Sequence, residues 1–150
     1  MEPASETIIW DVFGLKIIVR GHQYPTADDY ADANWLNVSV SYGANGANVA
    51  FDGPCLRTNE VASFLEQLEA MNTMQRGSAR LNCMEPNIDV KISREGSLGG
   101  LSVAIDITPD ISEQRHQFNS GSDLSYLPKI IQDGRKVLSV FPVKGDQNVH

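Results

Sequence analysis

Cysteine is scarce in this chain of 150 residues, and histidine is almost as rare. The two cysteines, Cys55 and Cys83, are too few for a zinc site built on four ligands, and a lone disulfide is uncommon in a cytosolic protein. We therefore expect two buried, reduced thiols. His22, His116 and His150 are far apart, and none has a ligand spacing to a cysteine or carboxylate. The sequence thus predicts no metal and no other cofactor.

Long apolar segments are also missing. No run approaches the roughly 20 residues that a membrane-spanning helix needs. The first ten residues, MEPASETIIW, contain no Lys or Arg and lack the long apolar core of a secretory signal. The chain has no internal repeat and no linker-like stretch. We expect residues 1–150 to form a single domain that stays in the cytoplasm and does not bind a membrane.

Positive charge is scarce in the first half of the chain. Residues 1–70 carry ten acids and three bases, whereas residues 71–150 carry nine of each, so the first half accounts for the whole net charge of −7. Without a basic stripe, nucleic-acid binding is not expected. A one-sided acidic field attracts basic partners and speeds their association at low salt. Acidic surfaces also aid solubility, and this simpler explanation stays open.

Most of the hydrophobic pattern alternates, which indicates antiparallel strands with one covered face. The alternating segments are residues 7–13, 15–20, 34–42, 47–51, 79–84, 88–93, 101–107 and 114–118. Residues 7–20 form either two strands or one strand bent at Gly14. An Asn45-Gly46 turn predicts a hairpin between the third and fourth segments, and residues 52–54 are expected to end it.

Two segments have helical spacing. The first is expected to be capped by Thr58 and to stop by Gly77, with Glu60 off its buried stripe. That stripe consists of Val61, Phe64, Leu65, Leu68 and Met71. The second is capped by Ser125 and stops at Pro142, with Leu127, Ile130, Ile131, Leu138 and Phe141 buried. We predict an α+β fold, an antiparallel sheet of about seven or eight strands with two helices packed on it.

Catalytic groups are not apparent. A fold can bring a cysteine near His22 or His116, but nothing in the sequence pairs them. Residues 96–100, GSLGG, join two predicted strands, so they favour a turn over a phosphate-binding loop at the start of a helix. Asp28 and Asp32 have the chemistry for acid–base work, yet clustered loop acids more often form a solvated or partner-facing surface. We expect the protein not to be an enzyme.

The clearest candidate for a binding surface is residues 28–42, DDYADANWLNVSVSY. Its first part gathers three carboxylates around an aromatic ring, and its second part alternates as a strand. Acidic and aromatic side chains suit a basic protein partner. The predicted partner-binding residues are Asp28, Asp29, Tyr30, Asp32 and Trp35, with Asp52, Glu66 and Glu69 as a flank. Trp35 fits a core role equally well.

Five segments together resemble one protein family. They are D-Y-x-D-A-N-W-L-N-V at residues 29–38, G-P-C-L-R-T at 53–58, E-P-N-I at 85–88, D-L-S-Y-L-P at 123–128 and F-P-V-K-G at 141–145. In this order and spacing they are similar to the WapI-type immunity proteins of bacterial polymorphic toxin systems. Leu124 stands where that pattern has Gln, a departure that concerns packing or capping more than function.

The resemblance implies a cytoplasmic immunity protein that binds and neutralises the C-terminal domain of a cognate toxin. In the best-known example of the family that toxin is a nuclease that cleaves tRNA, so a basic nuclease domain is the partner that the resemblance implies. An acidic domain can occupy a nuclease groove as a mimic of nucleic acid. The alternative is a generic, non-catalytic interaction or regulatory module with another partner.

Overall fold

The computed structural model describes residues 7–44 and 46–146, in which eight strands form two antiparallel sheets. The first sheet contains β1 (Ile8–Val12), β2 (Leu15–His22), β3 (Trp35–Ala44) and β4 (Ala47–Arg57), side by side in that order. The second contains β5 (Ser78–Asn82), β6 (Ile88–Glu95), β7 (Gly100–Ile107) and β8 (His116–Asp123) in the same manner. The α+β prediction is confirmed, with the strands divided between two sheets.

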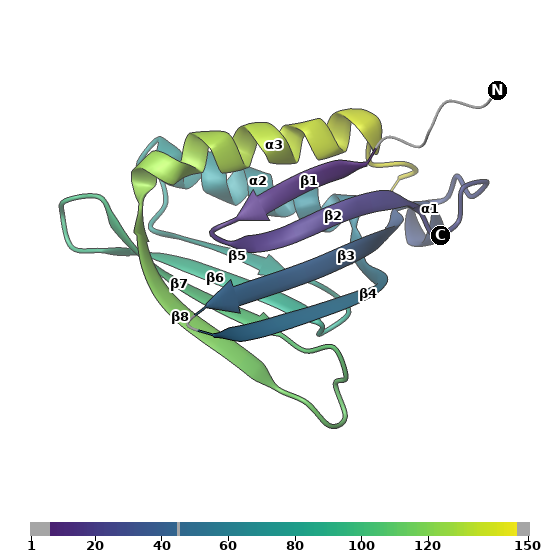
Figure 1. Cartoon of the computed structure of the whole chain (residues 1–150). Helices are drawn as coiled ribbons and strands as arrows, with labels where there is room; N and C mark the ends of the chain where they lie inside the picture. The colour runs from purple at the N-terminus through teal and green to yellow at the C-terminus, as the bar shows by residue number, and fades with distance from the viewer. Residues whose placement is uncertain (1–6, 45, 147–150) are drawn as a thin grey trace.

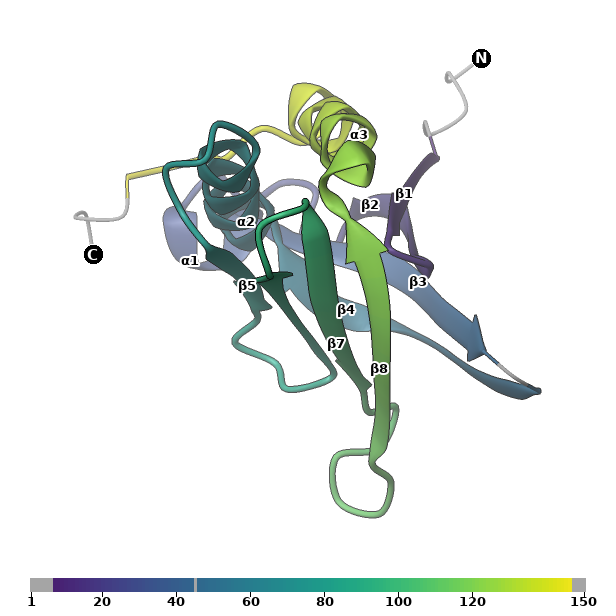
Figure 2. The same cartoon turned by 90° about the vertical axis from the view of Figure 1, so that its left-hand side faces the viewer.

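The two long helices lie along one edge of each sheet, next to β1 and β5. The short α1 (Tyr30–Ala33) precedes β3, α2 (Thr58–Asn72) connects the sheets, and a 3-10 turn (Leu124–Tyr126) leads into α3 (Leu127–Val140). α3 packs on β1, α2 packs on β5, and the two helices pack on each other (Figure 1). Seen from the side, the sheets diverge below the helices (Figure 2). No helix in the described part of the chain is long and apolar enough to cross a membrane.

Hydrophobic and polar residues alternate along the strands, so one face of each sheet lies in a shared hydrophobic core. Trp10 in β1 is fully buried, and its Nε1 donates a hydrogen bond to the carbonyl of Ile130 in α3 at 3.0 Å. Gly134 lets the helix come this close, because a Cβ there would lie 2.5 Å from Cδ2 of Leu65 and 3.1 Å from the Trp10 ring. A glycine that weakens an isolated helix by about 1 kcal/mol is therefore required by packing.

The two hairpins of the first sheet show which turn predictions were correct. β1 and β2 are separate strands, joined at Phe13 (φ 53°) and Gly14 (φ 93°), both in the left-handed region that a tight type I′ hairpin requires. β3 and β4 pair as predicted up to Ala44 opposite Ala47, while Asn45 lies outside the described residues.

The predicted end of the fourth strand at residues 52–54 is wrong. β4 continues to Arg57, and its register against β3 shifts by a bulge opposite residues 36–38. The shift leaves Pro54 and Cys55 between the pairs Val38–Gly53 and Leu36–Leu56, and a proline is tolerated there because β4 is the edge of its sheet. The extension matters for the site, since it carries the chain to the start of α2.

Both long helices begin or end differently from the sequence-based expectations. α2 is capped by Arg57 rather than Thr58, and it ends at Asn72 instead of running toward Gly77. α3 is capped by Tyr126, because Ser125 belongs to the 3-10 turn before it. In α3, Val137 is buried and Leu138 only half-buried. The last predicted strand also shifts, from residues 114–118 to His116–Asp123.

A side chain covers the outer edge of the second sheet. The Arg80 amide of β5 donates to Oε1 of Gln67 at 2.9 Å, and Nε2 of Gln67 donates to the Arg80 carbonyl at 3.2 Å. Gln67 lies on α2. Its amide thus makes the two hydrogen bonds that a neighbouring strand would otherwise make.

Candidate functional site

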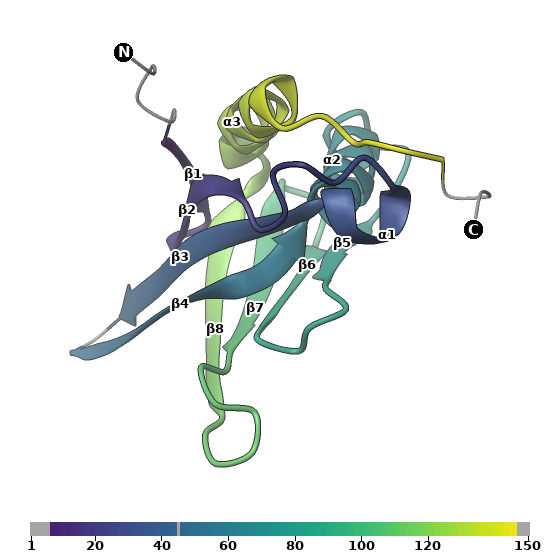
Figure 3. The same ribbon diagram turned by 90° about the vertical axis from the view of Figure 1, so that its right-hand side faces the viewer.

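An acidic groove of about 530 Å³ lies between α1, β4 and the loops that follow β2, β5 and β7. Figure 3 shows α1, β4 and the loop after β5 on one side of the molecule. The groove is lined by Gln23, Tyr24, Asp32, Trp35, Phe51, Asp52, Gly53, Pro54, Cys55, Glu85, Asn87 and Pro109. Three of these side chains are carboxylates, and none of the described lining residues is basic. This charge favours a cationic partner.

Three of the predicted binding residues meet in this groove. Asp32 comes from α1, Trp35 from the start of β3, and Asp52 from the middle of β4. Asp52 also accepts a hydrogen bond from the hydroxyl of Ser39 on the neighbouring strand. Residues separated in sequence therefore converge because the β3–β4 hairpin returns the chain beside α1.

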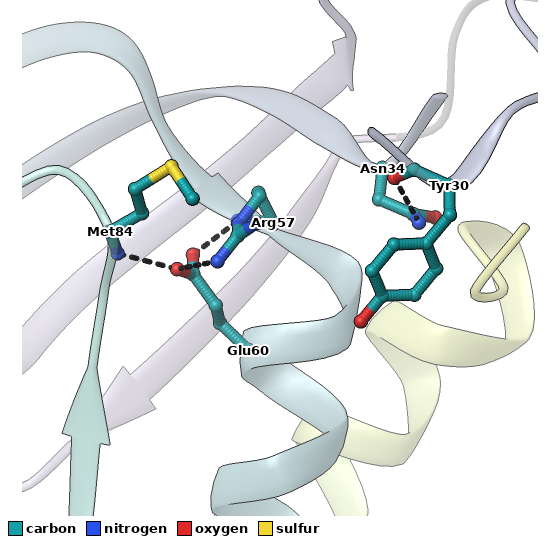
Figure 4. Close-up of polar contacts among 5 residues, drawn as sticks. All are labelled: Tyr30, Asn34, Arg57, Glu60 and Met84. Carbon is teal, nitrogen blue, oxygen red and sulfur yellow. Dashed lines mark hydrogen bonds and ion pairs between the residues drawn. The ribbon is translucent and has the colours of Figure 1, made fainter. Parts of the chain in front are cut away.

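The acidic loop, residues 28–32, borders the groove. Asp28 and Asp29 are exposed, and the carboxylate of Asp29 caps α1 by accepting from the Asp32 amide at 3.3 Å. Tyr30 is half-buried, and its carbonyl accepts a hydrogen bond from Nδ2 of Asn34 at 3.0 Å (Figure 4). Asp29 consequently has a structural role beside any role in binding.

The predicted flank on α2 does not line the groove. Glu66 is exposed on that helix. Glu69 accepts a hydrogen bond from Nε of Arg135 at 2.9 Å and so joins α2 to α3. The structure therefore separates Glu66 and Glu69 from Asp32 and Asp52.

Trp35 lies at the boundary between the core and the groove. It is half-buried, and the guanidinium carbon of Arg57 lies 5.3 Å from its ring centroid. Arg57 is in turn held by Glu60, through Nη2 at 3.0 Å and the backbone N–H at 2.8 Å. The contact of a cation with an aromatic face is favourable, and here it orders the wall of the groove.

Glu60 was expected off the buried stripe of its helix, yet it is only 6% exposed. Besides Arg57, it accepts a hydrogen bond from the Met84 amide at 2.6 Å (Figure 4). Met84 immediately precedes Glu85, the third carboxylate of the groove. The ion pair between half-buried Arg57 and buried Glu60 thus lies where α2 meets the loop that carries Glu85.

Sequence reasoning missed Glu85 as a member of the site, and it noted Tyr24 only as an aromatic residue beside the acidic loop. Glu85 belongs to the E-P-N-I segment, and Tyr24 precedes the acidic loop, so both were visible as polar or aromatic loop residues. The approach of Glu85 to Asp32 depends on how the two sheets pack against each other. No local pattern specifies that packing.

Neither cysteine has the properties of a catalytic nucleophile. Cys55 borders the groove but is buried, and burial raises the pKa of its thiol to about 12. Burial raises the pKa of Cys83 as well. Such thiols stay protonated at neutral pH and react slowly. Within residues 7–44 and 46–146, no three His, Cys, Asp or Glu side chains are placed to hold a metal ion; His150 lies outside that part.

Comparison with known proteins connects this architecture to a family. A family model, described as the immunity protein WapI-like family, matches residues 9–142. No curated protein and no solved structure matches the chain. The matched region includes both sheets almost completely and all eight predicted binding residues. Since the model covers most of its length, the chain belongs to the WapI-like immunity protein family.

Proposed function

We propose that this protein neutralises a cognate toxin domain by binding it through the acidic groove and the adjoining acidic loop. Membership of the family supports an immunity role and a toxin partner. The observation that carries the proposed site is the convergence of Asp32, Asp52 and Glu85 in one groove without a basic lining residue. Asp28 and Asp29 extend the same charge along the neighbouring loop.

The proposed partner is a basic toxin domain of the nuclease type, including nucleases that cleave tRNA. Enzymes that bind nucleic acid present cationic side chains to phosphates. An immunity protein with an acidic groove can cover those side chains and keep the substrate out. Neutralisation would take place in the cytoplasm, where such a toxin meets its RNA substrate.

Inhibition in this proposal is stoichiometric and needs no catalysis by the immunity protein. Charge steers the encounter, because opposite fields raise association rates at low salt. Aromatic side chains then supply short-range contact, since Trp and Tyr are enriched among residues that dominate interface energies. Trp35 and Tyr24 lie in the groove, and Arg57 keeps Trp35 in place.

A pair of charge-matched variants tests the site. Asp32→Asn with Glu85→Gln removes two charges from the groove, whereas Glu66→Gln with Glu95→Gln removes two exposed charges that do not line it. Binding to the toxin domain encoded beside this gene is measured at low and high salt. The groove variant should weaken binding at least about tenfold and flatten its salt dependence, while the control changes it by less than about threefold.

Two results would count against the proposal in different ways. Equal losses in both variants would show that total charge matters and that the groove is not the site. Failure of the unaltered protein to bind the toxin domain, or to protect its substrate in a nuclease assay, would reject the toxin partner and favour a generic interaction module.

A further inference from the structure

The acidic loop contains a helix that is too short to be stable alone. α1 has four residues, Tyr30–Ala33, which is about one turn. Helices of this length do not persist in water without tertiary contacts, because nucleation is unfavourable. Its internal support is small, a backbone hydrogen bond from the Ala33 amide to Asp29 at 2.9 Å and the cap from Asp29. Other parts of the chain must therefore hold the loop.

The side chain of Asn34 joins the loop to the C-terminal segment, residues 141–146. Asn34 is completely buried. Its Nδ2 donates to the carbonyls of Tyr30 and Lys144, both at 3.0 Å. Its Oδ1 accepts from the Lys144 amide at 2.8 Å and from the Thr58 hydroxyl at 2.7 Å. These four bonds use the full capacity of a side-chain amide, so the connection to Lys144 is specific.

Gly145 brings the C-terminal segment into direct contact with α1. A Cβ at this position would lie 2.4 Å from the backbone nitrogen of Tyr30 and 2.9 Å from its Cα. These are backbone atoms, so they cannot move aside unless α1 moves too. Gly145 also has φ of 76°, in the region that favours glycine. Close contact and backbone conformation both require the absence of a side chain.

The other end of the C-terminal segment is fixed in the core. Phe141 is buried, and its ring packs edge-on against His22 of β2 with centroids 5.1 Å apart. The segment then crosses from α3 to α1 on the side of the molecule seen in Figure 3. Both of its ends are thus held, one by Phe141 and one by Asn34 with Gly145.

We propose that the C-terminal segment is a positioning element for the toxin-binding loop, acting through Lys144 on Asn34 and through Gly145 on Tyr30. Without it, α1 loses two of its supports, and Asp28, Asp29 and Asp32 no longer share a fixed arrangement. The inference rests on the proposed function, because it assigns the loop a role in toxin binding. It adds that residues outside the groove determine the affinity of that site.

Gly145→Ala is the direct test, and Gly96→Ala is its matched control. Gly96 has nearly the same backbone angle, φ of 70°, but a Cβ there would meet no atom within 4 Å. Both variants therefore place alanine at a positive φ, but only Gly145→Ala brings a Cβ against α1. Hydrogen exchange of the Asp32 and Ala33 amides reports the order of the loop in the free protein, and toxin affinity reports its use.

Gly145→Ala should accelerate amide exchange at Ala33 and weaken toxin binding, each by at least about tenfold relative to Gly96→Ala. The circular dichroism spectra of the two variants should be similar.

A shortened chain is the second variant if Gly145→Ala does not fold. A chain that stops after Pro142 removes the contacts of Lys144 and Gly145 while keeping every strand and helix, and the same two effects are expected. Exchange at Ala33 equal to the control would overturn the inference. Faster exchange with unchanged affinity would support the positioning of the loop and overturn its assignment to toxin binding.

Discussion

Gln67 and Arg80 exchange two hydrogen bonds, although one lies on a helix and the other on the outer strand of a sheet. The amide of Gln67 satisfies the outward N–H and C=O of Arg80. Such groups on an exposed edge are otherwise open to pairing with another chain.

Gln67→Ala is expected to lower the free energy of unfolding by about 1 kcal/mol, since it removes the pair of hydrogen bonds to Arg80 together with longer, exposed ones to Ser63 and Arg76. The Arg80 amide should exchange with solvent faster than in the unaltered protein. The same substitution at the exposed Gln132 of α3 is the control and should leave stability within about 0.5 kcal/mol. Unchanged protection at Arg80 would show that Gln67 does not cover the edge.

Gly134→Ala should destabilise the protein even though alanine is the better helix former. The gain in helix propensity is about 1 kcal/mol, whereas overpacking a core costs about 1–3 kcal/mol. The new Cβ would meet Leu65 and Trp10, which are both buried and cannot turn into solvent. Chemical denaturation of Gly134→Ala, Leu65→Ala and the double variant measures the coupling. A double variant as unstable as the sum of the two would contradict this contact.

Glu60→Gln is expected to cost roughly 2–3 kcal/mol of unfolding free energy. The substitution retains the shape of the side chain, but it leaves Arg57 without its counter-charge and turns an N–H group toward donors. Glu66→Gln on the same helix is exposed and should be nearly neutral. Because Met84 also bonds to Glu60, amide exchange in the loop after β5 should rise. A cost as small as that of Glu66→Gln would show that the Arg57–Glu60 ion pair does not stabilise the protein.

His22 should make the protein less stable in mild acid. Burial and the nearby charge of Lys144 hold the pKa of His22 below its ordinary value of 6.5. Between that lowered pKa and 6.5 the unfolded chain binds more protons than the folded one, so the free energy of unfolding falls as the pH drops through this range. His22→Gln should flatten this dependence, measured by denaturation of the variant and the unaltered protein at several pH values. An equal slope in the two proteins would exclude His22 as its source.

The sequence was informative where a residue pattern depends on neighbours along the chain. Alternation identified the strands, the Asn45-Gly46 pair identified a hairpin, and the spacing of Phe64, Leu65 and Leu68 identified α2. The predicted ends of helices and strands were wrong where tertiary contacts outweighed the local preference of a residue for a cap or a turn. Thr58 looked like a cap, but its hydroxyl bonds to Asn34, and α2 is capped at Arg57 instead.

The candidate site was only partly predictable for the same reason. Asp32 and Trp35 are close in sequence, so their proximity follows from the chain itself. Glu85 follows Met84, whose amide binds Glu60 in a contact between a helix and a distant loop, and its place in the groove depends on how the two sheets pack. Periodicity placed Glu60 on a solvent face, and only the packed structure shows it buried.

The hydrogen bonds that complete this fold join residues from opposite ends of the chain. Trp10 and Ile130 are 120 positions apart, and Asn34 and Lys144 are 110 positions apart. During translation the first sheet therefore leaves the ribosome long before its partners in α3 and the C-terminal segment exist. Contacts of such long range form late in folding. A nascent chain therefore has the acidic loop without the contacts of Lys144 and Gly145, and those supports exist only after synthesis has passed Gly145.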